Sequence, residues 1–430
     1  MHKFNSSIQF AAILGTALAP VSALATGWDT TGIGSYDLLF SPKKVVVEGQ
    51  ATYVNVNVDY KNVKGTSQAG AARDQYFGAK TTQGSSGAIP DVDLYSLAAK
   101  VRLGNSIDCL GQLHTPISTH ESPGETWGGR YAVAETDAST TTFDATCSYK
   151  FNINENSSLR LIGGFGVSTV DFYTSSMQII PILGNPPAVP PSYLDAKTEV
   201  SMTEDGYGFG WRAGVGYEMP SIALRAYAIY NAEVEGDLEG DFLLSHDSAF
   251  NHQLDPTNTV GAKARATTTV TLPQSIEFGI RSGIAPNWLV SIGAKWTDWS
   301  IMEDLVVSFD KVEDITGKLN NGDKTKRILG YSDGWAVEGT VAHMVNEDLI
   351  VAASLKWDQG VGEIYSDTYQ FGLGGSYQIS EHSKVSLGGR AIYKTAGEGL
   401  YQSEDSAATG HYEYGDSWNF AVSSRLTFEF

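Results

Sequence analysis

The chain has 430 residues with a formal net charge of −20, and it contains 46 glycines, 21 tyrosines and 17 phenylalanines. The acidic balance argues against a nucleic-acid partner, because such a partner calls for a basic surface. Abundant glycine and strand-forming aromatic residues are typical of an all-β protein.

The N-terminus has the three-part layout of a secretory signal peptide, which we assign to residues 1–25. Lys3 stands near the start, an apolar stretch covers residues 8–18, and the small-residue pattern ALA ends at Ala25. The apolar stretch is too short for a transmembrane helix, which needs about 20 apolar residues. We therefore expect an exported chain.

From residue 45 onward, runs of alternating apolar and polar residues recur. In "DLYSLAAKVRL", Tyr95 and Leu97 stand on one parity and Lys100 and Arg102 on the other. This period of two is typical of a strand with one apolar face, and each run is about as long as a tilted strand that crosses a bilayer. The runs lie near 45–54, 93–103, 107–115, 140–151, 158–172, 206–217, 221–233, 274–284, 287–299, 333–345, 348–359, 366–378, 383–395 and 417–430.

The connections between these runs alternate between short and long. Turns such as "GNS" and "NINENS" contain a few residues, whereas the connections 116–139, 173–204 and 234–271 are much longer. Tight periplasmic turns opposite long external loops are typical of an outer-membrane barrel. The sequence therefore predicts a transmembrane antiparallel β-barrel over residues 45–430, with about fourteen strands, an even number as in bacterial barrels.

The final run, "SWNFAVSSRLTFEF", fits this interpretation. Trp418, Phe420 and Phe428 share one parity, and Asn419 and Arg425 share the other. We expect the apolar parity to face lipid, the polar parity to face the lumen, and the strand to pair on both edges so that the barrel closes.

The same parity argument places many charged residues inside the barrel, because charge on the lipid face is destabilising. Some of the basic ones could bind an anionic head group; alternatively, the charges pair with one another and fill the lumen. The predicted inward charges are Glu48, Lys100, Arg102, Arg160, Arg212, Arg225, Glu277, Arg281, Glu338 and Arg425.

The connection 173–204 is unusually apolar and rich in proline. Exposed apolar surface usually marks a binding site or an interface, although a loop that packs on itself is an equal alternative. We expect a hydrophobic ligand to be captured there. The candidate groove residues are Met177, Ile179, Ile180, Ile182 and Leu183.

Cys109 and Cys147 are the only cysteines, and we expect them to form a structural disulfide because the chain is exported. His246 and His252 lie in one connection but lack a third fixed ligand, so no metal is expected. The chain contains neither a G-x-S-x-G nor an H-E-x-x-H motif, and neither an enzymatic activity nor a cofactor is predicted.

The stretch "TLPQSIEFGIRSGIAPNWLVSIGAKWTDWS" resembles the long-chain fatty acid transporters of Gram-negative outer membranes, the FadL-like proteins. The matching features are Leu272-Pro273, Gly279, Trp288 and the segment 296–300. The stretches "YKFNINENSSLRLIGGFG" and "DGYGFGWRAGVGYEMPSIALRAYAIYNAEVEGDLEG" are similar to the same family. Together the similarity covers most of residues 140–300.

The resemblance implies a fourteen-stranded monomeric barrel with an N-terminal plug, which would be residues 26–44. It also implies that a hydrophobic ligand enters a groove between external loops, here 173–204 and 234–271, binds in the lumen and leaves sideways through a gap in the wall. The chain departs from the family in lacking its Asn-Pro-Ala plug motif and its proline-rich stretch before the last strands.

The resemblance and the inward parity together give the functional hypothesis. We expect passive uptake of long-chain fatty acids, with the head group held by the inward arginines Arg160, Arg212 and Arg225. The protein would contact the ligand and outer-membrane lipid. An aromatic hydrocarbon transporter of the same family, a general aqueous porin and, less favoured, a barrel enzyme or an adhesin are the alternatives.

Overall fold

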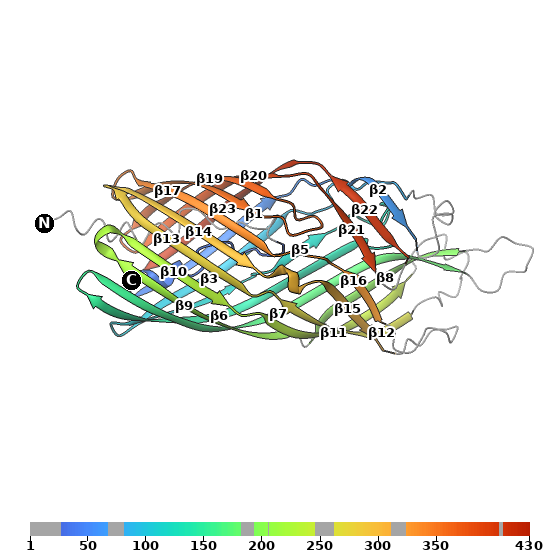
Figure 1. Ribbon diagram of the computed structural model, residues 1–430, viewed down its shortest axis with the longest axis horizontal. Helices are drawn as coiled ribbons and strands as arrows, with labels where there is room; N and C mark the ends of the chain where they lie inside the picture. Colours follow the sequence, from blue (N-terminus) through green and yellow to red (C-terminus); the bar gives the residue numbers. More distant parts are fainter. Residues whose placement is uncertain are drawn as a thin grey trace, which may run out of the picture.

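The structure, a computed structural model, describes residues 27–67, 81–181, 193–204, 206–245, 262–310, 324–403 and 407–430. Within them, 23 strand segments form one antiparallel sheet that closes into a barrel (Figure 1). Strand β1 (Val45–Asn55) pairs on one side with β3 (Val92–Leu103) and on the other with the last strand, β23 (Ser417–Glu429). The predicted all-β barrel of fourteen strands is confirmed.

Among the described residues, no helix has the length and apolarity needed to cross a membrane.

Several of the fourteen wall strands are interrupted, and each interrupted strand counts as two segments. The other segments are β2 (Lys61–Thr66), β4 (Ile107–His114), β5 (Ser118–Glu121), β6 (Glu135–Asn154), β7 (Ser157–Pro181), β8 (Tyr193–Glu204), β9 (Tyr207–Met219), β10 (Leu224–Asn231), β11 (Val234–Ser245), β12 (Ala262–Leu272), β13 (Ser275–Ala285), β14 (Trp288–Thr297), β15 (Asp304–Phe309), β16 (Lys324–Ile328), β17 (Gly334–Met344), β18 (Leu349–Asp358), β19 (Thr368–Ser380), β20 (Ser383–Lys394), β21 (Gly397–Ser403) and β22 (Thr409–Tyr414).

The short turns gather at one end of the barrel, where the C-terminus also lies (Figure 1). Residues 104–106 join β3 to β4, and residues 155–156 join β6 to β7. Strand segments that flank the longer connections, such as β2, β8 and β12, lie toward the opposite end (Figure 1). We call the two ends periplasmic and external, following the asymmetry of outer-membrane barrels.

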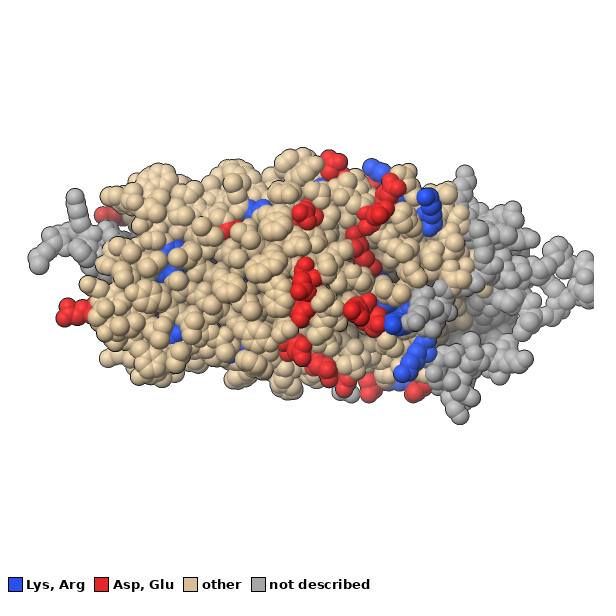
Figure 2. All heavy atoms as spheres, viewed as in Figure 1, with Lys and Arg blue, Asp and Glu red and all other residues tan. Residues whose placement is uncertain are grey.

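The outer face of the wall is apolar. Tyr95 is 68% exposed and Phe209 75% exposed. The apolar side chains predicted to face lipid on the last strand do point outward, and their exposed fractions range from 40% to 61%. Figure 2 shows that this face carries few charged side chains from the periplasmic end to a line of acidic residues nearer the external end. A band of this kind is what a bilayer covers.

The inner face carries the charges, as the alternation predicted. Lys100 is fully buried, and Arg160 and Glu277 are each only 1% exposed. Because a buried charge is costly unless it is paired, these side chains need partners inside the barrel. Lys100 and Arg160, for example, both contact Asp108, at 2.6 and 2.7 Å.

Residues 27–44, called here the inner segment, run through the lumen and include a short 3-10 helix, η2 (Asp37–Phe40). The segment passes so close to the wall that two wall positions have no room for a side chain. A Cβ at Gly216 would lie 2.8 Å from the ring of Phe40, and one at Gly293 would collide with Ile33.

The external end is narrowed by an unusual pairing. β16 pairs with β21 and so bypasses the hairpin formed by β18 and β19. The connection of that hairpin, residues 359–367, folds inward, with Val361, Ile364 and Tyr365 at most 4% exposed. These apolar side chains become part of the core below the mouth of the barrel.

Candidate functional site

The barrel wall is incomplete between β3 and the strand formed by β4 and β5. β3 pairs with β4 from Leu103↔Ile107 up to Ser96↔His114. Beyond that point, β3 still pairs with β1 as far as Val92, but among the described residues it has no partner on the other side. We call this unpaired stretch the open seam.

The open seam begins where Pro116 interrupts the strand. Proline has no backbone N–H to donate to a ladder, so it favours a break or an edge. β5 resumes two residues later, and its register with β6 is shifted by one residue relative to that of β4. The strand therefore bends while staying attached to β6.

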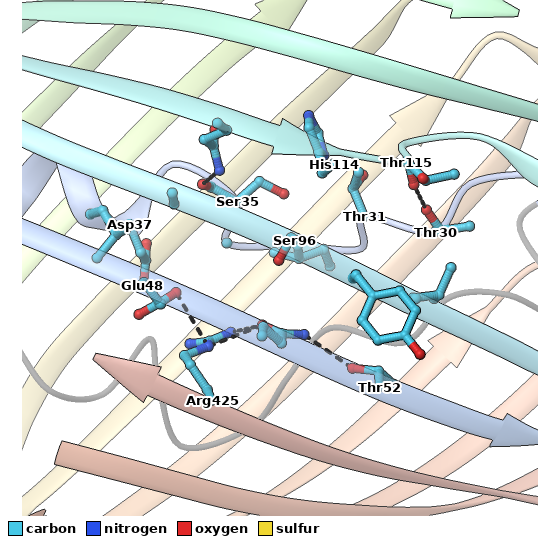
Figure 3. A pocket seen from close by; sticks show the side chains of 18 of the residues that line it. Thr30, Thr31, Ser35, Asp37, Glu48, Thr52, Ser96, His114, Thr115 and Arg425 are labelled. Atoms are coloured by element: carbon cyan, nitrogen blue, oxygen red, sulfur yellow. Dashed lines mark hydrogen bonds and ion pairs between the residues drawn. The ribbon is translucent and has the colours of Figure 1, made fainter. Parts of the chain in front are cut away.

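The inner segment occupies the position that β3 vacates. The N–H of Thr30 donates to the carbonyl of Pro116 at 2.9 Å, and the N–H of Ser118 donates to the carbonyl of Trp28 at 2.8 Å. The Thr30 hydroxyl also donates to the Thr115 carbonyl. Figure 3 shows this contact beside a cavity that Ser96 and Arg425 also line. Backbone groups that lose a strand partner are thus satisfied by the inner segment.

The opposite side of the inner segment is held to the far wall by polar side chains. Lys295 contacts Asp29 at 2.6 Å. The N–H of Gly34 donates to Glu277 at 2.7 Å, and the Tyr36 hydroxyl donates to Asn231 at 2.6 Å. The segment therefore bridges the lumen between the open seam and strands on the other side.

Three cavities lie in series around this bridge. The upper cavity, about 320 Å³, lies toward the external side, and eleven of its sixteen lining residues are apolar. The central cavity, about 130 Å³, shares Ile117 and Leu272 with it. The upper cavity is lined by Trp28, Ile117, Ala138, Ser139, Thr140, Val170, Phe172, Thr269, Val270, Thr271, Leu272, Ile301, Met302, Asp304, Leu305 and Leu329.

The third cavity, called the gap cavity, reaches the open seam. It has a volume of about 110 Å³ and is lined by Leu94, Tyr95 and Ser96 of β3. A partition separates it from the central cavity. The four partition residues line both cavities and are Thr31, Ser35, Gln112 and His114.

Hydrogen bonds and ion pairs stabilise the partition. The Gln112 side chain donates to the carbonyl of Ser35 at 3.0 Å. His114 lies 2.8 Å from Asp144, which also pairs with Arg212. No group of three or more potential metal ligands occurs among the residues that the structure describes. All four partition residues are polar, whereas most residues that line the upper cavity are apolar.

A second charged cluster lies between β5 and the inward connection 359–367. The Tyr60 hydroxyl donates to Glu121 at 3.0 Å, and Arg327 lies 3.6 Å from Glu363. The outward residues of β6 are polar at this level, so the cluster is external to the membrane-spanning band. Burial, followed by the neighbouring charge of Glu363, raises the pKa of Glu121 to about 7, and burial also raises the pKa of Glu363.

A family profile described as outer membrane protein transport protein (OMPP1/FadL/TodX) matches residues 11–390. The chain belongs to this family. The family and the barrel place this FadL-type protein in the outer membrane of a Gram-negative bacterium.

Individual relatives are distant from this FadL-type chain. It is 23% identical to the long-chain fatty acid transport protein of Escherichia coli O6:H1 over 314 residues, 68% of each chain. It is 26% identical to outer membrane protein P1 of Haemophilus influenzae over 207 residues, 46% of this chain and 41% of that protein. It thus spans less than half of the second relative.

Two solved structures are similar in fold. A Pseudomonas aeruginosa FadL homologue superposes with a TM-score of 0.70 at 14% identity, covering 96% of this chain and 98% of the other. The Ralstonia pickettii toluene transporter TbuX superposes with a TM-score of 0.59 at 12% identity, covering 97% and 100%. At this level of identity the similarity concerns the fold alone.

The three arginines predicted to hold a head group are all engaged in ion pairs of the FadL-type lumen. Arg160 contacts Asp108 and Glu218 at 2.7 and 2.6 Å. Arg212 pairs with Asp144 beside the partition, and Arg225 pairs at 2.8 Å with Asp37 of the inner segment. Of the three, only Arg212 lines the central cavity.

The predicted groove residues lie differently from the expectation of an exposed loop. β7 continues to Pro181, and Met177 and Ile179 are each only 8% exposed. They pack with Tyr131 and Ala408, and the N–H of Met177 donates to the carbonyl of Arg130 at 2.9 Å, so the connection before β6 covers this face of β7. Ile180 belongs to the same strand, while Ile182 and Leu183 lie outside the described residues.

Cys109 and Cys147 face each other on β4 and β6 and form a disulfide, with 4.0 Å between their Cα atoms.

The sequence did not predict the partition, which includes His114 and Gln112. Pro116 was the available signal, because a proline inside an alternating run marks an interruption of the ladder.

Proposed function

We propose that this protein takes up hydrophobic small molecules, foremost long-chain fatty acids, and releases them sideways into the outer membrane. The observation that carries the proposal is the open seam beside a series of lumen cavities. An aqueous pore would need a continuous wall around a wide channel, whereas here a charged and packed lumen meets an interrupted wall.

The cavities suggest an order of events for an amphiphilic ligand. Its tail first occupies the upper cavity, where burial stabilises by about 0.8 kcal/mol per CH₂. It then passes the central cavity, and the partition around Thr31 and His114 has to yield before the tail reaches the gap cavity. Tyr95 marks the side of that cavity where the wall is open.

The inner segment acts in this proposal as a plug. It is held to the far wall by Lys295–Asp29 and Arg225–Asp37, and to the open seam by backbone hydrogen bonds. Displacing it from Pro116 would expose backbone groups, so a ligand that moves it must replace those contacts or fill the space. We infer a monomer in contact with outer-membrane lipid, acting as a transporter and not as an enzyme.

Aromatic hydrocarbons are the second candidate ligand class. The upper cavity, about 320 Å³ and lined mostly by apolar residues, is large enough for a small aromatic ring. A neutral hydrocarbon needs no cationic partner. Transport that depends on basic residues of the lumen would therefore indicate a fatty acid, and transport that does not would indicate a hydrocarbon.

The experiment is uptake of radiolabelled oleate by a bacterial host that lacks its own transporter, with and without this protein. We expect uptake that saturates and that unlabelled oleate competes. If folded protein in the outer membrane restores toluene entry but no oleate uptake, the ligand is an aromatic hydrocarbon. A large, steady ion conductance in a planar bilayer would instead indicate a porin.

A further inference from the structure

Arg281 is a buried cation that lacks a hydrogen-bonding partner. It points inward from β13 and is 7% exposed. Its guanidinium makes no hydrogen bond with any residue that the structure describes, and its Nε is buried without a partner. The nearest carboxylate oxygen with which it forms an ion pair belongs to Asp37, at 4.0 Å.

A second arginine competes for that carboxylate. Arg225 lies directly opposite Arg281 on the neighbouring strand β10. It contacts the Asp37 carboxylate at 2.8 Å and also donates to the Asp37 carbonyl at 3.2 Å. Like charges opposite each other destabilise a sheet, and one carboxylate cannot neutralise both guanidinium groups.

The neighbouring carboxylates are already engaged with other groups. Glu218 pairs with Arg160 at 2.6 Å. Glu277 accepts hydrogen bonds from the Tyr227 hydroxyl, at 2.6 Å, and from the N–H of Gly34. Arg281 therefore carries a positive charge that its surroundings leave largely uncompensated.

This charge faces space that leads to the open seam. Arg281 lines the gap cavity, which Tyr95 and Thr115 also line. It also lines a cavity of about 180 Å³ next to Phe40 and Pro42, on the periplasmic side of the inner segment. Arg281 thus lines two cavities, and its guanidinium makes no hydrogen bond with a described residue.

We propose that Arg281 binds the carboxylate of an amphiphilic ligand on the exit side of the inner segment, while the tail points toward the open seam. A guanidinium matches a carboxylate with two parallel hydrogen bonds, so the site favours a fatty acid over a neutral hydrocarbon. The inference rests on the proposed function, and it differs from a head-group role for Arg160, Arg212 or Arg225, whose charges are already paired.

The test compares oleate with oleyl alcohol, which has the same tail and no charge, in binding to the purified barrel. For Arg281→Met we expect oleate affinity to fall about 10- to 100-fold, the usual range for a lost charged hydrogen bond. Oleyl alcohol affinity should change less than about twofold, because an apolar tail does not need the cation.

A matched control removes a cation of the same cavity that is already neutralised. Lys384 lines the gap cavity and contacts Glu429 at 2.5 Å. The double variant Lys384→Met with Glu429→Gln should leave the affinities for both ligands near those of the wild type. Unchanged oleate binding in Arg281→Met, or equal losses for oleate and oleyl alcohol, would overturn the proposal.

Asp37→Asn in an Arg225→Met background, compared with Arg225→Met alone, tests the same idea in the opposite direction, because Arg225, the closer partner of Asp37, is then absent from both proteins. This comparison remains informative if Arg281→Met does not fold. Removing the competing carboxylate should tighten oleate binding and leave oleyl alcohol binding unchanged. Weaker oleate binding in this variant would contradict the inference. If the wild type binds and transports neither compound, the proposed function itself fails, which is a distinguishable result.

Discussion

The strand formed by β4 and β5 has two seams, and they differ sharply. Its seam with β6 is paired below Pro116 and again above it, and the disulfide between Cys109 and Cys147 crosses it. Its seam with β3 ends at His114. The same strand thus belongs to a closed wall on one side and to an opening on the other.

The difference teaches how a barrel can open without losing its integrity. A break in the ladder at Pro116 leaves backbone groups that must find new partners, because buried unpaired groups are costly. The inner segment supplies those partners through Thr30 and Trp28. The opening in the wall is therefore tied to the position of the inner segment.

The largest expected effect comes from filling the open seam. Ser96 is the last residue of β3 that pairs with β4, and its side chain lines the gap cavity. A cavity of about 110 Å³ cannot hold both an indole and a ligand tail. We expect Ser96→Trp to reduce oleate uptake by at least about tenfold, a barrier increase of about 1.4 kcal/mol.

The control for this variant places the same side chain on the lipid face. Ser424 is exposed on β23, so Ser424→Trp should transport at the wild-type rate. Normal uptake by a folded Ser96→Trp barrel would show that ligand does not leave through the open seam.

The next largest effect concerns stability and the paired seam between β4 and β6, which the disulfide crosses. Replacing both Cys109 and Cys147 with alanine should lower the free energy of unfolding by about 2 to 4 kcal/mol, because a cross-link of this kind restricts the unfolded chain. Oleate uptake should persist, since the hydrogen bonds between β4 and β6 remain. Heat-dependent mobility on denaturing gels, with and without reductant, measures the first effect. A large loss of uptake with unchanged stability would contradict this assignment.

The smallest effect lies at the external end of the open seam, at Glu121. The pKa of Glu121 is raised to about 7, above its value in an unfolded chain, about 4.3. The folded state then binds more protons between these values, so stability falls as the pH rises through that interval. We expect the apparent melting temperature of the wild type to fall by a few degrees, roughly 2 to 5 °C, between pH 5 and pH 8.

Glu121→Gln removes this titration and should melt at a more constant temperature over the same range, although Glu363 still titrates in the variant. An equally steep pH dependence in Glu121→Gln would assign the effect to other groups.

The sequence predicted the wall well and the site only in part. Alternation located the fourteen strands, and parity placed Lys100 and Glu277 inside correctly. The predicted end of β7, at residue 172, was wrong, because the strand continues to Pro181. The prolines mark where the strand ends, because the first of them, Pro181, is also the last residue of β7.

What the sequence determined by itself is the barrel and the side of the wall that each residue faces. Both follow from a period of two and from the difference between lipid and lumen, which are local properties. Which charges pair was decided only by the tertiary structure. Asp29 and Lys295 are 266 positions apart, and Asp37 and Arg225 are 188 apart. Ion pairs over such separations depend on how the inner segment lies in the lumen. The same holds for Arg281, whose guanidinium comes no closer than 4.0 Å to the Asp37 carboxylate.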